Sequence, residues 1–247
     1  MLDTPSQAHQ LLLNFPNQPQ YSFSNFIVSE GSRFAFSMAQ KICDGGSFST
    51  LHISGERGLG KTHLLMSIGN HLAENFPDRK ALYLDCITFV KTMDDSDTVE
   101  LALKQILKVD YFLLDNVDQI AGHPHAQEKL YFIYNSLMEM KKVIVFTGGL
   151  APERLPSIAD DLTSRFQWGV LAQLKPIDDA TTARIIEKLG FDLELEIPNA
   201  IITYLLNRIP RDFQSIQNAV TLINQESYVQ KKKVTLPLVK KTLGLGG

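Results

Sequence analysis

The sequence predicts an α/β protein in which a parallel sheet sandwiched by helices is followed by a small all-α domain. Up to about residue 176, short apolar runs typical of buried strands alternate with amphipathic helical stretches. After Lys175 and Pro176 only helical patterns follow. A glycine-rich segment also separates the first apolar run from the helix after it, as is common at the end of a strand in such sheets. These observations together predict helices on both faces of a parallel sheet.

Four apolar runs are expected to form strands, because they are short and rich in branched and aromatic residues. They lie at residues 51–53, 81–84, 111–114 and 143–146. Amphipathic stretches after the first and third runs predict helices at 61–76 and 127–139. A helix between two strands of one sheet allows the strands to lie parallel.

The rest of the chain is expected to form helices at 178–189, 198–208 and 212–229, and Pro237 opens a short fourth helix. At the other end, three prolines within residues 5–19 interrupt regular structure and predict a loosely attached segment. We therefore expect three parts, which are a flexible arm at 1–20, an α/β domain at 21–176 and a helical lid domain at 177–247.

The composition excludes several classes of protein. Lys and Arg number 24 against 27 Asp and Glu, a net charge of -3, which is not the positive charge of a protein that holds nucleic acid by itself. Two cysteines, Cys43 and Cys86, suit neither a disulfide framework nor a zinc site. No apolar run approaches the roughly 18 residues of a membrane span, and the first residues lack the pattern of a signal peptide. We therefore expect a cytoplasmic protein that does not bind a membrane.

Residues 55–62 match the phosphate-binding pattern G-x-x-x-x-G-K-[ST] between a predicted strand and a predicted helix. Its glycines let successive N–H groups point at phosphate oxygens, and the helix N-terminus adds partial positive charge. We expect Lys61 to reach the β- and γ-phosphates and Thr62 to hold Mg²⁺. A plain turn before a helix is the alternative, which the flanking strand and helix disfavour. The expected nucleotide contacts of this segment are Gly55, Gly58, Leu59, Gly60, Lys61, Thr62 and His63.

Four apolar residues at 111–114 end in Asp115, which is expected to hold Mg²⁺ from the end of its strand. This pair of segments resembles those of AAA+ ATPases, and active members of that family place a second carboxylate directly after this aspartate, where it orients the attacking water. This chain has Asn116 there, and an amide oxygen does not accept a proton near neutral pH. The pattern favours a protein that binds a nucleotide and hydrolyses it poorly. The alternative is a base elsewhere in the chain.

With these residues, the chain resembles the AAA+ family, and in particular the nucleotide-binding core of the replication initiator DnaA. The resemblance covers about residues 21–230, and the segments that carry it are 21–28, 58–64, 127–128 and 163–169. It implies that ADP or ATP is the cofactor, together with Mg²⁺. The residues to which it gives roles are Phe26, Ile27 and Val28 beside the adenine, Thr147 as the γ-phosphate sensor, Arg211 as the sensor of the lid and Arg165 as an arginine finger for a neighbouring subunit.

Thr147 and Arg165 also have simpler interpretations, whereas the position of Arg211 favours a bound phosphate. Thr147 precedes two glycines and could end a strand. Arg165 follows Asp161 by four residues, the spacing of an ion pair along a helix. Arg211 precedes a predicted helix, where a cation faces the positive end of the dipole at a cost of about 0.3–1 kcal/mol, and a bound phosphate would remove that cost.

The predicted arm contains a second resemblance. Residues 10–15 are similar to peptides that dock on the bacterial DNA sliding clamp, in which a glutamine bonds in one subpocket and apolar side chains fill another. An arm packed on its own domain is the alternative. The expected clamp contacts are Gln10, Leu11, Leu13 and Phe15. The residues after Arg211 are too few for the separate DNA-reading domain of DnaA, so we expect DNA to be reached only through the clamp.

The combination is similar to DnaA-related regulators of replication initiation. This resemblance implies a negative regulator that docks on the clamp and stimulates ATP hydrolysis by DnaA through Arg165 in trans. The regulator would act in its nucleotide-bound form, and the resemblance favours ADP as that nucleotide. The alternative is an active DnaA-like ATPase that loads a helicase or remodels DNA. The sequence leaves open the resting nucleotide, the extent of the chain's own hydrolysis, and whether it forms a homodimer or a higher oligomer.

Overall fold

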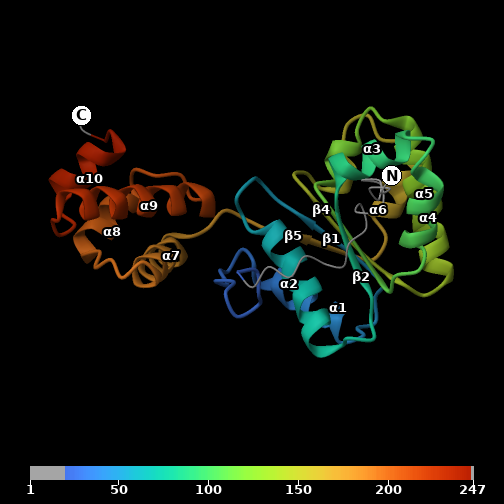
Figure 1. The fold of residues 1–247 in the computed structure, drawn as a ribbon, viewed down its shortest axis with the longest axis horizontal. Coiled ribbons are helices and arrows are strands. Elements are labelled where there is room, and N and C mark those ends of the chain that lie inside the picture. Colours follow the sequence, from blue (N-terminus) through green and yellow to red (C-terminus); the bar gives the residue numbers. More distant parts are fainter. Residues whose placement is uncertain (1–19, 246–247) are drawn as a thin grey trace, which may run out of the picture. The chain divides into compact units, whose positions relative to one another are not determined.

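The computed structural model describes residues 20–245, which form two compact units (Figure 1). The first, here called the α/β unit, contains the described residues 20–26, 34–55 and 61–174. The second, the helical unit, contains 27–33, 56–60 and the described residues from 175 onward. The predicted clamp-docking residues at 10–15 lie outside the described part of the chain.

The α/β unit is built on a five-stranded sheet in the order β2-β3-β4-β1-β5, and every neighbouring pair is parallel. The strands are β1 Thr50–Ser54, β2 Ala81–Asp85, β3 Tyr111–Asp115, β4 Val143–Gly148 and β5 Val170–Gln173. The predicted fold class is confirmed, and the four predicted strands are found with slightly wider bounds. The edge strand β5 was not predicted, because it is short and only Ala172 is buried in it.

Helices cover both faces of this sheet (Figure 1). The predicted helices appear as α2 Lys61–Asn75 and α5 Pro124–Glu139, and α5 begins early because a proline is tolerated in the first turn. Side chains alternate between the faces: Phe112 and Phe146 join the core under α3, α5 and α6, while Leu113 and Val145 are buried on the other face. The helices missed from the sequence are α1 Arg33–Cys43, α3 Cys86–Asp94, α4 Val99–Ile106 and α6 Asp160–Phe166.

Two short 3₁₀ helices complete the α/β unit, η2 Val117–Ile120 and η3 Pro152–Arg154. The first directly follows β3 and Asn116 and therefore sets the backbone around the end of that strand. Its Asp118 accepts a hydrogen bond from the N–H of Gly149 at 2.9 Å, so the segments that follow β3 and β4 are held together.

In its described residues the helical unit contains four helices, each of which has buried apolar side chains. They are α7 Asp179–Asp192, α8 Asn199–Leu206, α9 Phe213–Gln230 and α10 Leu236–Leu243. Asp178 and Asp212 cap α7 and α9 by accepting hydrogen bonds from the N–H groups of Thr181 and Ser215, at 2.7 and 2.9 Å. The predicted helices are therefore found, and their ends differ from the predicted ends by a few residues. The two caps set the starts of α7 and α9, and the proline in the first turn of α10 marks the start of that helix.

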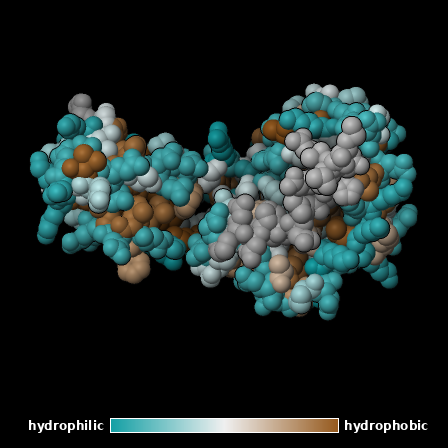
Figure 2. Space-filling model, in the orientation of Figure 1, coloured by the Kyte–Doolittle hydropathy of each residue, from teal (hydrophilic) through white to brown (hydrophobic). Residues whose placement is uncertain are grey.

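The face of the molecule in Figure 2 is mostly hydrophilic, with apolar residues gathered in small groups on each unit. Within residues 20–245, the structure has no helix with both the length and the apolar character needed to cross a bilayer. Both cysteines are buried free thiols.

Candidate nucleotide-binding site

The predicted phosphate-binding loop connects the end of β1 to the start of α2. Gly58 and Gly60 have φ angles of +80° and +98°, a region that residues other than glycine rarely adopt. A β-carbon at Gly58 would also come within 2.7 Å of the side chain of Asp212, and the Gly58 carbonyl accepts a hydrogen bond from the N–H of Phe213 at 3.0 Å. The glycines are therefore required by the backbone path and by close packing.

Lys61 is buried at the first position of α2, with 8% of its surface exposed. Its ammonium group donates a hydrogen bond to the carbonyl oxygen of Gly55 at 2.7 Å. Burial lowers the pKa of Lys61, and the nearby carboxylates of Asp115 and Asp118 act in the opposite direction. The side chain is thus folded against its own loop, where a phosphate oxygen could replace the carbonyl as its acceptor.

Asp115 is 2% exposed at the end of β3 and is the centre of a hydrogen-bond network. Its Oδ2 accepts from the hydroxyl of Thr62 at 2.8 Å and from the hydroxyl of Tyr83 at 3.1 Å, and its Oδ1 accepts from Thr147. Desolvation, the carboxylate of Asp115 and the hydrogen bond to it raise the pKa of Tyr83, which keeps that phenol protonated as a donor. The structure therefore brings Thr62, Asp115 and Thr147 together.

These oxygen atoms fit the chemistry of Mg²⁺. A hydroxyl and a carboxylate 2.8 Å apart are the hard donors that this ion prefers, and it commonly takes only one or two protein ligands beside phosphate and water oxygens. Within residues 20–245, no group of three or more His, Cys, Asp or Glu side chains could hold a metal without such additional ligands.

Asn116 follows Asp115 in a left-handed backbone conformation, with φ 57° and ψ 48°. Its N–H donates to the hydroxyl oxygen of Thr147 at 2.9 Å, and its side-chain amide donates to Oδ2 of Asp85 at 3.1 Å. Thr147 is fully buried within β4 and links Asn116 to Asp115, so its side chain belongs to the hydrogen-bond network of the site as well as to the strand.

The predicted adenine segment contributes an aromatic cluster to the α/β unit. Phe26 stacks on Phe36 with ring centroids 5.6 Å apart and meets the ring of His63 edge-on at 5.3 Å. His63 donates from Nε2 to the carbonyl oxygen of Ser22 at 3.1 Å, and burial lowers its pKa, which favours the neutral ring. Ile27 and Val28 are half-buried in the segment that belongs to the helical unit.

Arg211 lies in the helical unit, two residues before α9. Its guanidinium forms an ion pair with Asp179 at 2.7 Å, while Asp212 caps the helix. The carboxylate of Asp179, in the same unit, therefore offsets the unfavourable position of Arg211 beside the helix N-terminus.

Arg165 lies in the last turn of α6 and is held by uncharged groups of the α/β unit. Its Nε donates to Asn135 at 2.9 Å and its Nη2 to the hydroxyl of Tyr131 at 3.3 Å, and the guanidinium lies 4.4 Å from the ring centroid of Trp168. In the part of the chain that the structure describes, no carboxylate lies within 4.0 Å of this guanidinium, so the alternative pair with Asp161 does not form.

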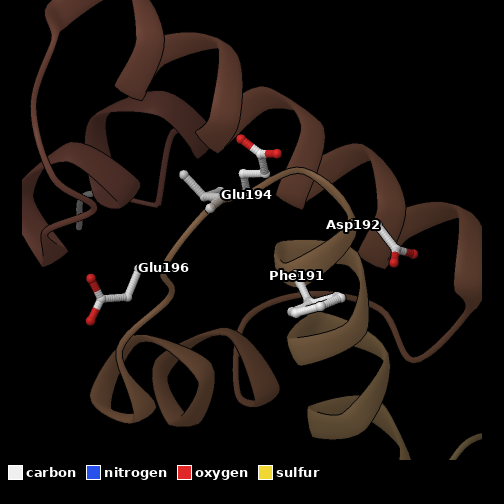
Figure 3. Close-up of a pocket in the computed structure, with 5 residues that line it drawn as sticks. Phe191, Asp192, Glu194 and Glu196 are labelled. Atoms are coloured by element: carbon white, nitrogen blue, oxygen red, sulfur yellow. The ribbon is translucent and has the colours of Figure 1, made fainter.

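A pocket elsewhere in the helical unit contains none of the predicted site residues. It lies at the C-terminal end of α7 and is lined by Phe191, Asp192, Glu194, Leu195 and Glu196 (Figure 3). Three carboxylates would repel a phosphate, so this pocket does not suit a nucleotide.

Sequence reasoning missed Asp85, Tyr83, Asn135 and Tyr131, each of which contacts a residue singled out from the sequence. Asp85 and Tyr83 lie in β2, whose parallel register places Asp85 opposite Asp115. An acid at the end of a strand next to β3 was a signal that could have identified Asp85. Asn135 lies in the middle of α5, and no local pattern distinguishes it.

A glycine-rich loop between a strand and a helix, with Asp115 at the end of another parallel strand of the same sheet, defines a P-loop nucleotide-binding protein of the AAA+ type. Residues 17–173 match the family model of the bacterial DnaA ATPase domain, and residues 179–243 match that of the Hda lid domain. The chain belongs to the family of bacterial DnaA ATPase domains, and its lid is of the Hda type. The predicted relation to DnaA is confirmed.

Solved structures agree with this assignment. Domain III of the Thermotoga maritima replication initiation protein DnaA is 30% identical over 93% of this chain and 98% of its own, with a TM-score of 0.86. AMPPCP-bound DnaA from Aquifex aeolicus is 28% identical over 86% of this chain and 67% of its own, with a TM-score of 0.79. The Thermotoga maritima RuvB Holliday junction branch migration motor is 17% identical over 91% and 72%, with a TM-score of 0.70, a likeness of fold alone.

Proposed function

We propose that this chain is a nucleotide-bound negative regulator of DNA replication initiation, which docks on the DNA sliding clamp and stimulates ATP hydrolysis by DnaA. Its membership of the DnaA family and its Hda-type lid support a regulator related to DnaA. The clamp contact is proposed from residues 10–15 alone. DnaA and the clamp are thus the proposed partners, and DNA is reached through the clamp.

The proposed cofactor is an adenine nucleotide together with Mg²⁺, and ADP is the nucleotide that we favour. A relative of known structure was solved with AMPPCP bound. In this chain, the glycine loop would hold the phosphates, Lys61 would neutralise their charge, and Thr62 and Asp115 would hold the metal ion. Thr147 and Arg211 are the proposed sensors, and residues 26–28 the proposed adenine segment.

The environment of Arg165 carries the proposal that hydrolysis is stimulated in trans. Its two hydrogen-bond acceptors and the Trp168 ring fix the direction of the guanidinium without neutralising its charge. A guanidinium has five N–H donors, so donors remain for an anion brought by a partner. Such a finger stabilises charge that develops on the transferred phosphoryl group and can accelerate hydrolysis by about 10³–10⁵.

The test mixes the purified protein, clamp loaded on DNA, and DnaA with labelled ATP. Arg165→Ala should retain nucleotide and clamp binding but lose stimulation, and Arg165→Lys should recover little of it, because an ammonium lacks the guanidinium fork. Arg154→Ala, at an exposed arginine of the same unit, is the matched control and should stimulate fully. Full stimulation by Arg165→Ala would remove the finger from the mechanism. No stimulation by the unaltered protein, together with rapid hydrolysis on its own, would favour the active ATPase instead.

A further inference from the structure

A hydrogen bond between two side chains joins the C-terminal ends of β2 and β3, where the nucleotide site is proposed. Asp85 is the last residue of β2, and the parallel register places it opposite Asp115 of β3. Its Oδ1 accepts from the N–H of Ile87, which caps α3, and its Oδ2 accepts from the side-chain amide of Asn116 at 3.1 Å. Both oxygens of Asp85 therefore have fixed donors.

The same bond belongs to a chain of donors and acceptors across three strands. Asn116 donates from its amide to Asp85 and from its backbone to Thr147, and Thr147 donates in turn to Asp115. Asp85 and Asp115 are carboxylates and can only accept hydrogen bonds. Thr147 donates its single hydroxyl proton to Asp115, so its oxygen can only accept from Asn116. The orientation of Asn116 is thus determined from both sides.

The hydrogen bond to Asp85 makes an amide fit this position and a carboxylate fit it poorly. The φ of 57° suits asparagine and aspartate alike, so the backbone does not distinguish the two. A carboxylate at position 116, however, would have no hydrogen to donate to Asp85, so two negative charges would meet at hydrogen-bond distance.

We infer that Asp85 is a positioning residue that selects an amide at position 116 and thereby keeps a water-orienting carboxylate out of this site. The inference rests on the proposed function, because it explains how a chain with an otherwise complete phosphate loop would hold a nucleotide without hydrolysing it. Weak hydrolysis then depends on two residues at the ends of neighbouring strands, and changing Asn116 alone does not restore a working carboxylate.

The test is a set of exchanges between the two residues. Four purified proteins are compared, namely the unaltered chain, Asp85→Asn, Asn116→Asp, and the exchange variant with both changes. The exchange variant has the same composition and net charge as the unaltered chain, and it keeps one amide donor facing one carboxylate. Asp78→Asn, at an exposed aspartate, is the control for loss of one carboxylate.

Asn116→Asp should melt at least about 3 °C below the unaltered protein, because like charges meet at this edge. The exchange variant should recover most of that loss, and the isolated protein should then hydrolyse ATP at least about tenfold faster than either Asn116→Asp or the unaltered chain. An exchange variant that melts no higher than Asn116→Asp, or that hydrolyses no faster, would overturn the inference. Because neither DnaA nor the clamp is present, failure of the proposed function in the stimulation assay would leave this result unchanged, and the reverse also holds.

Discussion

The hydroxyl of Thr62 donates a hydrogen bond to Oδ2 of Asp115 at 2.8 Å, which joins the first turn of α2 to the end of β3. The two residues lie 53 positions apart in the sequence, and the parallel sheet brings them together. Their contact places two oxygen donors side by side, in position for a metal ion.

Replacement of Asp115 should therefore remove the effect of magnesium on nucleotide affinity. For Asp115→Asn we expect ADP to bind at least about tenfold more weakly with Mg²⁺, because a ligand to the ion is lost, and with little change in the presence of a chelator. Calorimetric titration measures both. Asp110→Asn, just before the opposite end of the same strand, is the matched control. Full enhancement by Mg²⁺ in Asp115→Asn would exclude this metal site.

Lys61 should be needed for nucleotide binding. Lys61→Ala removes the main positive charge of the loop, and we expect the affinity for ADP to fall at least about thirtyfold, the effect of deleting one partner of a buried charged pair. The melting temperature should change little, because the variant loses the hydrogen bond to the carbonyl of Gly55 but no longer buries an ammonium group. Lys91→Ala, at an exposed lysine, serves as the control. Unchanged affinity in Lys61→Ala would refute the assignment of the phosphate loop.

The predicted arm can be tested separately from the fold. Replacing Gln10, Leu11 and Phe15 by alanine should abolish clamp binding, because the glutamine bond and two apolar anchors are lost. Nucleotide binding and melting temperature should stay as they were. Alanine at Ser6 and Gln7 provides the control within the same segment. If the triple variant melts several degrees lower and still binds the clamp, the arm is part of the fold and the docking interpretation fails.

His52 should make the stability of the protein depend on pH. It is buried in β1, neither ring nitrogen has a hydrogen-bond partner among the described residues, and burial lowers its pKa from 6.5 to about 4, against a smaller opposite effect of Asp118. The unfolded chain therefore binds this proton more readily than the folded chain. The contribution of His52 is complete above about pH 6.5 and is lost as the pH falls toward 4.

The free energy of unfolding should consequently fall by about 2 kcal/mol between pH 7 and pH 5 through this one residue. Urea unfolding at the two pH values measures the difference. His52→Leu should show a correspondingly smaller drop, whereas His123→Leu, at a half-exposed histidine, should behave like the unaltered protein. An equal drop in His52→Leu and the unaltered protein would exclude His52 as its source.

The sequence was most informative where function depends on local spacing. The glycine loop and Asp115 follow from residues close in the chain, and the alternation of strands and helices follows from apolar periodicity. The partners of Arg165 could not be predicted, because Asn135 and Tyr131 are 30 and 34 residues distant and meet it only through the packing of α5 on α6. The bond between Asp85 and Asn116 similarly depends on the register of two strands.

The short elements escaped prediction for a different reason. A strand of four residues such as β5, or a helix of seven such as α6, contains too few positions for a period to be recognised. The start of α3 is set by the side chain of Asp85, which accepts from the N–H of Ile87, and this cap is visible only once the preceding strand is known.

The strand order also constrains how the chain folds during synthesis. β1 is an interior strand of the sheet, yet both of its neighbours come late in the chain: Thr50 pairs with Ile144, and Leu51 with Val170. At about 5–20 residues per second, β1 leaves the ribosome roughly 5–20 s before β4 does. Throughout that interval β1, which is buried along its whole length in the folded protein, has no partner on either side, and such unpaired strands are prone to aggregate. The nascent chain of this protein should therefore depend on chaperones until β4 emerges.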